Sequence, residues 1–174
     1  MATYEGKTFL EKPQLIMRWP RFRLEKRLPQ TIEDGYSIRM YQPGDEQRFL
    51  ELMEFGAFDP WDVDKLRYNL NRAIPQGWFF VVHTKPQLPV ATVMCLHNYS
   101  EDTPFCGDIG WLACDPKHRG KGLGVQIMSW ATNRFWEAGY SAIQLKTEFY
   151  RLPAIKTSIT NGEKICGKLW RRGD

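Results

Sequence analysis

The most informative part of the chain reads Pro116-Lys117-His118-Arg119-Gly120-Lys121-Gly122-Leu123-Gly124. It joins an apolar, strand-like segment (109–114) to a long helix-like segment (125–138). Glycines at alternate positions let successive backbone N–H groups turn inward without a Cβ in the way, and the following helix presents its positive N-terminus. Two basic side chains add full positive charge beside them. The stretch therefore predicts a cradle for phosphate groups.

Two common phosphate-binding patterns do not fit this cradle. A P-loop requires Ser or Thr directly after its lysine, whereas Lys121 is followed by Gly122. A dinucleotide fingerprint comes directly after the first strand of its domain, whereas these glycines lie late in the chain. A glycine-rich helix entry that binds no ligand is the simpler alternative.

Length and charge indicate one main domain with an extension. The chain has 174 residues and a formal net charge of +4, and much of the excess lies between Lys12 and Arg27. We expect residues 1–35 to form a basic and aromatic arm and residues 36–174 to form the domain. The modest charge argues against nucleic acid as the main partner, although the arm is a candidate contact for nucleic acid or a protein.

The cysteines predict neither a metal site nor a disulfide framework. Cys95, Cys106, Cys114 and Cys166 are far apart and lack the short paired spacing of zinc ligands. We expect reduced thiols, no metal and a cytoplasmic protein. No apolar run approaches the length of about 20 residues that a membrane span requires, so we expect no membrane association.

Hydrophobic periodicity predicts alternating strands and helices after residue 35. The expected strands are 36–41, 78–83, 90–99, 108–114, 141–147 and 164–170. The expected helices are one after the turn 42–45, which Asp45 caps, and others at 63–73, 125–138 and 153–161. The class is mixed α/β, with the cradle between the fourth strand and the third helix.

The cradle in this position resembles the acetyl-CoA signature of the GCN5-related N-acetyltransferase (GNAT) superfamily. The shared pattern is a strand, Asp-Pro, Arg119-x-x-Gly122-x-Gly124 and a helix. The resemblance implies a mixed, mostly antiparallel central sheet flanked by helices and splayed between its fourth and fifth strands. It also implies acetyl-CoA as cosubstrate and direct acetyl transfer to an amine.

The same resemblance implies which residues bind the cofactor. The pantetheine amides would pair with the fourth strand at Leu112, Ala113 and Cys114. The diphosphate would contact Gly120, Lys121, Gly122, Leu123, Gly124 and Val125. Arg119 would shape the loop, and Ile155 in the later Ala-Ile pair would complete the site. Cys114 as a covalent acyl acceptor is an alternative that we do not favour, because the family transfers the acyl group directly.

The acceptor amine must lose a proton, and two carboxylates are candidate bases. An alkylammonium with a pKa near 10.4 is neutral in only about one molecule in a few thousand at pH 7, so a base or a water chain is needed. The family often places a carboxylate four residues before the first donor-binding position, which is Asp108 here. Glu148, after the fifth strand, is the second candidate.

The segment 152–163 departs from the family pattern. Its Ala-Ile pair should lead to Leu-Tyr and then Gly-Phe, but Thr157-Ser158 replaces Leu-Tyr and Glu163 replaces Phe. Ser158 thus stands where the family has the tyrosine that protonates the leaving thiolate. A serine hydroxyl is much less acidic than a phenol, so we expect Ser158 to act only through water.

These observations predict an N-acetyltransferase for a primary amine of a small molecule, amino acid or peptide N-terminus. A catalytically degenerate acyl-CoA-binding module is the alternative, motivated by Ser158 and Glu163. A homodimer is left open.

Overall fold

The computed structural model describes residues 14–19, 27–99, 103–148 and 150–162, and the backbone of 164–170. Its elements are β1 (Gln14–Arg18), β2 (Tyr36–Met40), α1 (Glu46–Phe55), α2 (Val63–Arg72), β3 (Ala73–His83), β4 (Leu88–His97), β5 (Cys106–Cys114), η2 (Pro116–His118), α3 (Leu123–Glu137), β6 (Ala142–Glu148), α4 (Leu152–Asn161) and β7 (Lys164–Trp170). From β2 onward, this is the order of strands and α-helices predicted from the sequence.

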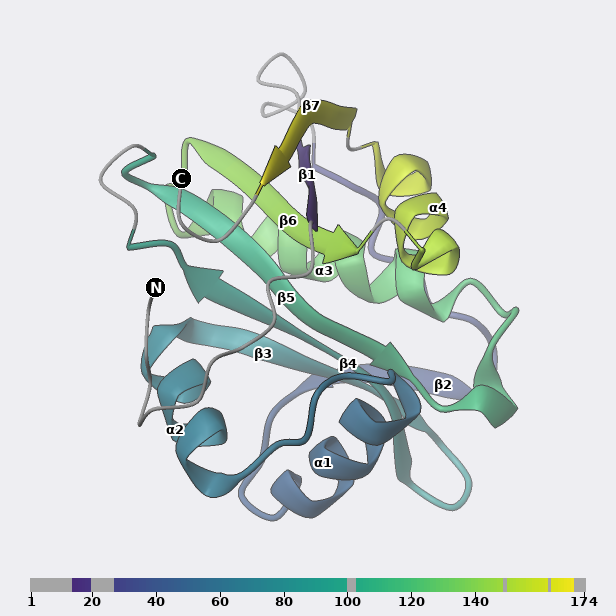
Figure 1. Cartoon of the computed structure of the whole chain (residues 1–174). Coiled ribbons are helices and arrows are strands. Elements are labelled where there is room, and N and C mark those ends of the chain that lie inside the picture. The colour runs from purple at the N-terminus through teal and green to yellow at the C-terminus, as the bar shows by residue number, and fades with distance from the viewer. Residues whose placement is uncertain (1–13, 20–26, 100–102, 149, 163, 171–174) are drawn as a thin grey trace.

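Among the described residues, seven strands form one sheet in the order β2-β3-β4-β5-β6-β1-β7. β5 and β6 run parallel, and the other neighbouring strands pair antiparallel. Helices α1 and α2 lie on one face of this sheet, and α3 and α4 lie on the other (Figure 1). The mixed, mostly antiparallel α/β fold is confirmed.

The sheet opens between β5 and β6, as expected for the fourth and fifth strands of the domain. The two strands pair from Cys106 opposite Ala142 to Ile109 opposite Leu145. Beyond that point they diverge, as Figure 1 shows. In the described part of the chain, β5 therefore has a paired edge toward β4 and an unpaired edge toward β6 over residues 110–114.

Strand β1 was not predicted, because residues 14–18 lie in the segment interpreted as an arm. It pairs with β6 on one side and with β7 on the other. Next to it, Trp19 is buried and packs edge-on against Trp136, with ring centroids 5.5 Å apart. The boundary expected at residue 35 thus does not separate this strand from the domain's sheet. Most of the basic residues of the expected arm lie outside the described residues.

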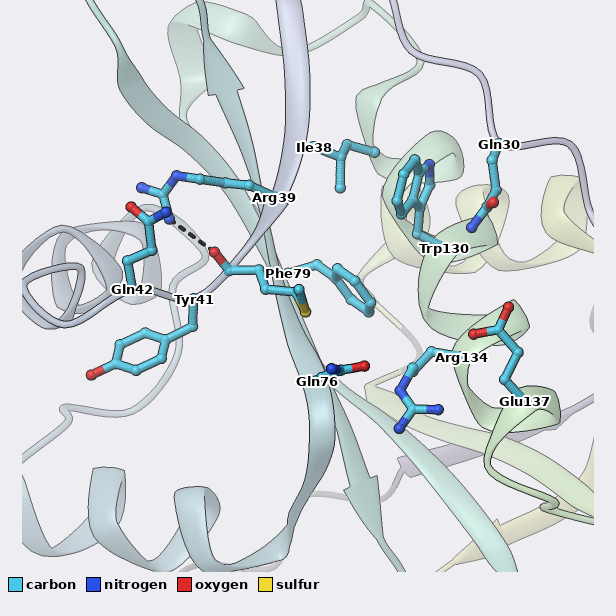
Figure 2. Close-up of a pocket in the computed structure, with 11 residues that line it drawn as sticks. Gln30, Ile38, Arg39, Tyr41, Gln42, Gln76, Phe79, Trp130, Arg134 and Glu137 are labelled. Carbon is cyan, nitrogen blue, oxygen red and sulfur yellow. Dashed lines mark hydrogen bonds between the residues drawn. The ribbon is translucent and has the colours of Figure 1, made fainter.

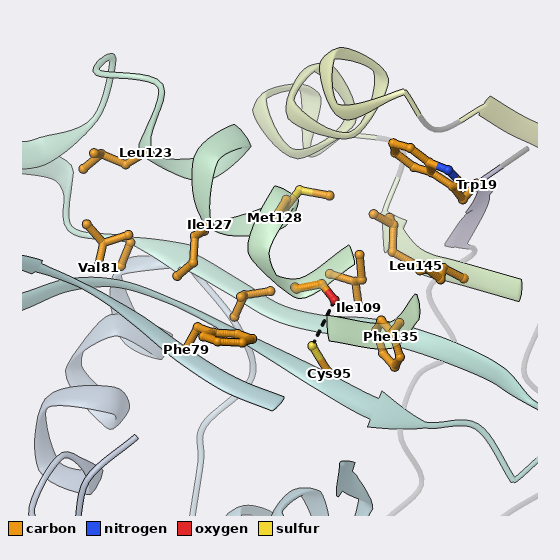
Figure 3. Close-up of a cluster of buried hydrophobic side chains, with 14 of the residues drawn as sticks. Trp19, Phe79, Val81, Cys95, Ile109, Leu123, Ile127, Met128, Phe135 and Leu145 are labelled. Carbon is orange, nitrogen blue, oxygen red and sulfur yellow. Dashed lines mark hydrogen bonds between the residues drawn. The ribbon is translucent and has the colours of Figure 1, made fainter. Parts of the chain in front are cut away.

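Two apolar clusters hold the layers together, one on each face of the sheet. On one face, Phe49 and Leu52 of α1 pack with Trp78 and Phe80 of β3. On the other, α3 inserts apolar side chains between itself and the strands. Figure 3 shows Leu123, Ile127 and Phe135 of α3 directed toward Phe79, Val81, Cys95 and Ile109 of the sheet. This packing fixes where α3 begins and so where the cradle lies.

Local signals end the helices largely as expected. Gly139 after α3 and Gly162 after α4 adopt positive φ angles of 81° and 102°, as helix-terminating glycines do.

Asp45 precedes α1, but its carboxylate does not cap the helix. It accepts hydrogen bonds from the Gln42 amide at 2.8 Å and from Arg39 at 2.6 and 2.8 Å. Asp45 is thus the N-cap residue of α1, as the turn 42–45 predicts, but it makes no side-chain cap, because Arg39 and the turn take up its oxygens.

Candidate cofactor and catalytic site

The glycine-rich stretch forms a loop whose amides remain open. Gly120 and Gly122 have φ angles of 81° and 74°, a region that favours glycine because it has no Cβ. Gly122 is the N-cap of α3 and has no side chain to cap the helix. Within the described part of the chain, no acceptor contacts the amides of residues 120–125. The loop therefore fits a phosphate-bearing group, with the helix dipole adding to the attraction.

The turn before this loop is tied to the body of the protein. The Asp115 carboxylate accepts from the Lys117 amide at 3.0 Å and from Arg48 of α1 at 2.6 Å. The His118 ring lies 2.8 Å from the Tyr36 hydroxyl. Burial lowers the pKa of His118, the Asp115 carboxylate opposes this, and the nearby positive charges of His83, Lys121 and Arg48 lower it further. The turn is thus held by α1 and by β2.

Arg119 does not point into the cradle. Its Nε donates to the carbonyl of Cys114 at 3.1 Å, and its Nη2 donates to the carbonyl of Phe55 at 2.8 Å. The first bond holds the loop against the end of β5, and the second holds the last residue of α1. The side chain therefore joins the loop to β5 and to α1.

Residue Trp111 introduces an irregularity into β5 that the sequence did not reveal. Its φ is 57°, and the register with β4 shifts so that Trp111 and Leu112 together lie opposite Val93. The shift is a β-bulge, which reverses the alternation of side chains along the strand. Gly110 and Trp111 consequently both face α1 and α2, whereas Leu112 faces α3. The unpaired edge of β5 begins at this bulge.

Beyond the bulge, the three residues expected to meet pantetheine have side chains committed to packing. Ala113 belongs to the cluster under α1, whereas Leu112 and Cys114 pack against the cluster under α3. Only their backbone groups can then serve a ligand at the open edge. Burial raises the pKa of the Cys114 thiol to about 11. A thiol this weakly acidic is a poor nucleophile, which argues against the covalent alternative.

Asp108 lies where β5 and β6 separate. One carboxylate oxygen accepts from Arg72 Nη2 at 3.2 Å, and the other accepts from Gln144 Nε2 at 2.8 Å. The Arg72 contact is an ion pair between side chains that are 19% and 13% exposed, and each carboxylate oxygen can accept a further hydrogen bond. Arg72 could not be predicted as its partner from the local sequence, because it lies 36 residues before Asp108 in the chain.

Glu148, the second candidate base, is engaged by an arginine. Its Oε2 accepts from Arg151 Nε at 2.5 Å, and its Oε1 accepts from Gln14 Nε2 at 3.4 Å. Both charged side chains are largely buried, at 17% and 18% exposure. The structure thus places Glu148 in an ion pair at the start of α4, on the opposite side of the gap from Arg119.

Ser158 has its hydroxyl committed within its own helix. The side chain is buried, and Oγ donates to the carbonyl of Ala154 at 3.0 Å. The neighbouring Thr157 faces the cradle instead, because a Cβ on Gly124 would lie 3.4 Å from its methyl group and 3.6 Å from its hydroxyl. Ile155 packs against the cluster under α3. The α4 hydroxyl that adjoins the cradle is therefore that of Thr157, which the sequence analysis did not single out.

A surface cavity of about 600 Å³ lies away from this gap, between the edge strand β2 and α3. Figure 2 shows Phe79 and Trp130 beside it, with Arg134 and Glu137 of α3 at its rim. Arg39 is paired with Asp45, and Arg134 donates to the Pro75 carbonyl at 2.7 Å. The predicted cofactor residues do not line this cavity, because they surround an open gap between strands.

The part of the chain that the structure describes has no metal cluster and no helix that could span a membrane. In the described residues, no group of three or more His, Cys, Asp or Glu side chains is arranged to hold a metal ion. None of the described helices is both long and apolar enough to cross a bilayer. Cys95, Cys106 and Cys114 carry free thiols, and the side chain of Cys166 lies outside the described residues.

Comparison with known sequences identifies the family. The family model described as the acetyltransferase (GNAT) family matches residues 46–157, which is more than half of the chain. The chain belongs to the GNAT acetyltransferase family. The match spans α1 through most of α4 of this GNAT chain and so contains the cradle, the bulge and Asp108.

Two curated GNAT relatives share about a quarter of their residues with the chain. Mycothiol acetyltransferase from Corynebacterium aurimucosum is 26% identical over 176 residues, which cover 99% of this chain and 54% of that protein. N-alpha-acetyltransferase 30 from Saccharomyces cerevisiae is 25% identical over 125 residues, covering 67% of this chain and 70% of that protein. The GNAT chain thus spans about half the length of the first relative.

Solved structures show the same fold at low identity. A GCN5-related N-acetyltransferase from Sphaerobacter thermophilus superimposes with a TM-score of 0.71 at 20% identity, covering 89% of this chain and 50% of that one. A chain in the NatC complex bound to Gag peptide and CoA gives a TM-score of 0.65 at 22% identity, covering 74% and 84%. At such identities the likeness establishes the GNAT fold.

Proposed function

We propose that the chain is an acetyl-CoA-dependent N-acetyltransferase that moves an acetyl group directly to a primary amine. The observation that carries the proposal is the unpaired edge of β5 at residues 110–114, which leads directly into a loop with open amides. A ligand with amides along one part and a diphosphate at one end matches both features. Membership of the GNAT family supports the same assignment.

The residues that would hold the cofactor divide into two groups. Backbone groups of Leu112, Ala113 and Cys114 would pair with the pantetheine amides, and the amides of residues 120–125 would bind the diphosphate. Ile155 would contribute apolar surface from α4. When bound, acetyl-CoA supplies the acetyl thioester. The chain's own task is to hold that group, to accept the proton of the amine and to exclude water.

Asp108 is the proposed proton acceptor. It lies at the point where the gap opens, on the face of the sheet that carries Gly110 and α2. Arg72 and Gln144 orient its carboxylate and leave acceptor capacity on both oxygens. We propose that a water molecule links it to the amine. Both carboxylates pair with an arginine, but Glu148 is the less favoured base, because Arg151 approaches it to 2.5 Å whereas Arg72 lies 3.2 Å from Asp108.

Protonation of the leaving thiolate needs a protein side chain less than deprotonation of the amine does. Free thiols have a pKa near 8.5, so coenzyme A can depart partly as a thiolate. Ser158 would need to release the Ala154 carbonyl before it could donate. We therefore propose a solvent proton for this step, with Ser158 acting at most through water.

The proposed acceptors are a small amine, an amino acid or a peptide N-terminus. One relative is named as an N-alpha-acetyltransferase, and one structural neighbour holds a peptide together with CoA. The other relative is named for mycothiol. Because these proteins are named for different acceptors, we propose only that the acceptor is a primary amine of one of these three kinds. A cytoplasmic location and a homodimer stay predictions.

A catalytically degenerate acyl-CoA-binding module is the second candidate. The observation in its favour is that the hydroxyl of Ser158 and the carboxylate of Glu148 are both committed to other partners. Such a module would bind acyl-CoA through the cradle and the β5 edge but would not catalyse acetyl transfer.

Two measurements test these candidates. Calorimetry with coenzyme A and acetyl-CoA reports binding, and release of free thiol with a panel of primary amines reports turnover. Gly122→Val should weaken binding at least tenfold, because valine disfavours a φ of 74° and its side chain crowds the open amides. Gly139→Val imposes similar strain at a φ of 81° away from the cradle and should retain binding. Binding without thiol release would favour the second candidate, and absence of binding would refute both.

A further inference from the structure

The turn that follows α1 lies directly on the open part of β5. A Cβ on Gly56 would be 3.4 Å from the Cβ of Ala113, and the ring of Phe58 packs edge-on against Trp111 with centroids 5.5 Å apart. Both contacts are on the face of the sheet opposite α3. The turn 55–58 therefore forms a wall beside the residues proposed to hold the thioester end of the donor. An acceptor that approaches from this face must meet it.

The carbonyls of this turn are held from across the gap. Arg151, directly before α4, donates from Nη1 to the carbonyl of Gly56 at 2.5 Å and from Nη2 to that of Ala57 at 3.0 Å. Its guanidinium also lies over the ring of Phe58, 4.5 Å from the centroid. Carbonyls at the end of a helix carry partial negative charge and have no partner in the helix, so a guanidinium satisfies them well.

The turn needs such support because its backbone is irregular. Ala57 has a φ of 51°, a conformation in which alanine is disfavoured. The amides of Gly56, Ala57 and Phe58 each bond back to α1, at 3.0, 2.9 and 3.3 Å. The carbonyl side of the same turn is held by Arg151, together with Arg119 at the carbonyl of Phe55. The two arginines come from opposite sides of the gap.

Arg151 is itself fixed in orientation. Glu148 accepts from its Nε at 2.5 Å, and the two side chains are 17% and 18% exposed. The guanidinium group thus donates to one carboxylate and two carbonyls. The two charged side chains are largely shielded from solvent, and charge-assisted hydrogen bonds are strong in such a setting. A lysine cannot reproduce this arrangement, because its donors radiate from a single nitrogen.

We propose that Arg151 is a positioning residue that holds the turn 55–58 against β5 and so shapes the acceptor side of the site. Glu148 acts through Arg151 by orienting it. This inference rests on the proposed function for its kinetic consequence, but the contact itself is independent of turnover. The residue does not touch the proposed donor-binding backbone, so its loss should affect the acceptor and leave the donor bound.

The test compares Arg151→Met and Arg151→Lys with the control Arg134→Met. Arg134 also directs two guanidinium nitrogens to one carbonyl, that of Pro75 at 3.0 and 2.7 Å, but away from the gap. Hydrogen exchange of amides 56–58 is the first readout, and it needs no substrate. We expect exchange at these amides to rise at least about tenfold in Arg151→Met, less in Arg151→Lys, and not in Arg134→Met.

The second readout is kinetic and uses the most active amine of the panel. We expect the KM for the amine to rise about tenfold or more in Arg151→Met, with coenzyme A affinity by calorimetry within about threefold of the parent protein. Arg151→Lys should recover part of this loss, and Glu148→Gln should show a smaller rise. Should Arg151→Met not fold, Arg151→Lys and Glu148→Gln carry both readouts.

The two proposals fail in different ways. Unchanged exchange at amides 56–58 in a folded Arg151 variant overturns the positioning role, whatever the activity. An unchanged KM for the amine, or an equal loss of coenzyme A affinity, overturns the acceptor-side role. Increased exchange in a protein that releases no thiol with any amine would support the contact and refute the transferase assignment.

Discussion

The Asp115 carboxylate lies 2.6 Å from the guanidinium of Arg48, and this ion pair joins α1 to the residue directly after β5. The two side chains are only 9% and 15% exposed. The same carboxylate caps the η2 turn through the Lys117 amide. One buried contact therefore connects the helix that ends at the acceptor side with the turn that leads into the cradle.

We expect Asp115→Asn to lower the free energy of unfolding by about 1–3 kcal/mol. The side-chain amide of this variant can still accept a hydrogen bond, but it carries no charge. The buried guanidinium of Arg48 then keeps only Glu51, at 2.6 Å, as an acidic partner. Chemical denaturation followed by tryptophan fluorescence measures the change. Asp64→Asn removes the exposed pair with Arg67 and should have little effect. Equal losses in the two variants would contradict the importance of burial.

The same residue predicts acid sensitivity. Burial alone would raise the pKa of the Asp115 carboxyl, but the Lys117 amide and Arg48 outweigh it and hold the pKa below its ordinary value. Protons then bind the unfolded chain at a higher pH than the folded protein, so this group stabilises the fold above about pH 4 and the stabilisation disappears as the pH falls further. Unfolding titrations from pH 7 to 3 should give a shallower decline in Asp115→Asn. Parallel curves would argue against this linkage.

Gly107 has no room for a side chain. A Cβ there would lie 2.3 Å from the ring of Phe135, which is fully buried in the cluster under α3. We expect Gly107→Ala to destabilise the protein by about 1–3 kcal/mol or more through overpacking. In Gly110→Ala on the same strand, the new atom meets the flexible end of Leu96 at 2.8 Å, so a smaller loss is expected in the same denaturation assay. The reverse ranking would show that Phe135 can move aside.

Asp108→Asn tests the proposed proton acceptor. The amide preserves shape and still accepts from Arg72 or Gln144 but cannot take a proton, so we expect kcat to fall about 10²–10⁴-fold with coenzyme A affinity retained. Steady-state thiol release with the best amine, measured across pH, gives the effect. Glu148→Gln should instead act mainly on the KM for the amine, through Arg151. A small change in kcat for Asp108→Asn would remove this residue from the chemistry.

Much of the fold and part of the site could be predicted from local patterns. The glycines at 120 and 122, the apolar period of α3 and the order of elements from β2 onward are consequences of nearby residues. Strand β1 escaped prediction because five residues between prolines carry too little periodic signal. Its partners lie more than 120 residues away, as the Arg18–Gln144 side-chain bond shows. The bulge at Trp111 has one weak local signal, the isolated Gly110 directly before it, but the residue with the positive φ angle is the tryptophan itself.

The amino-acid sequence by itself determined that the chain has a mixed sheet, a helix after β5 and an amide-lined loop, because backbone conformation at glycine and the periodicity of apolar residues act over a few neighbours. Only the tertiary structure decided the partners of the charged groups. Asp108 pairs with Arg72 of α2, and Arg151 donates to the carbonyls of Gly56 and Ala57 in the turn after α1. These hydrogen bonds of 2.5 to 3.2 Å join residues 36 to 95 positions apart, so they depend on how the helices pack on the sheet, which no local pattern encodes.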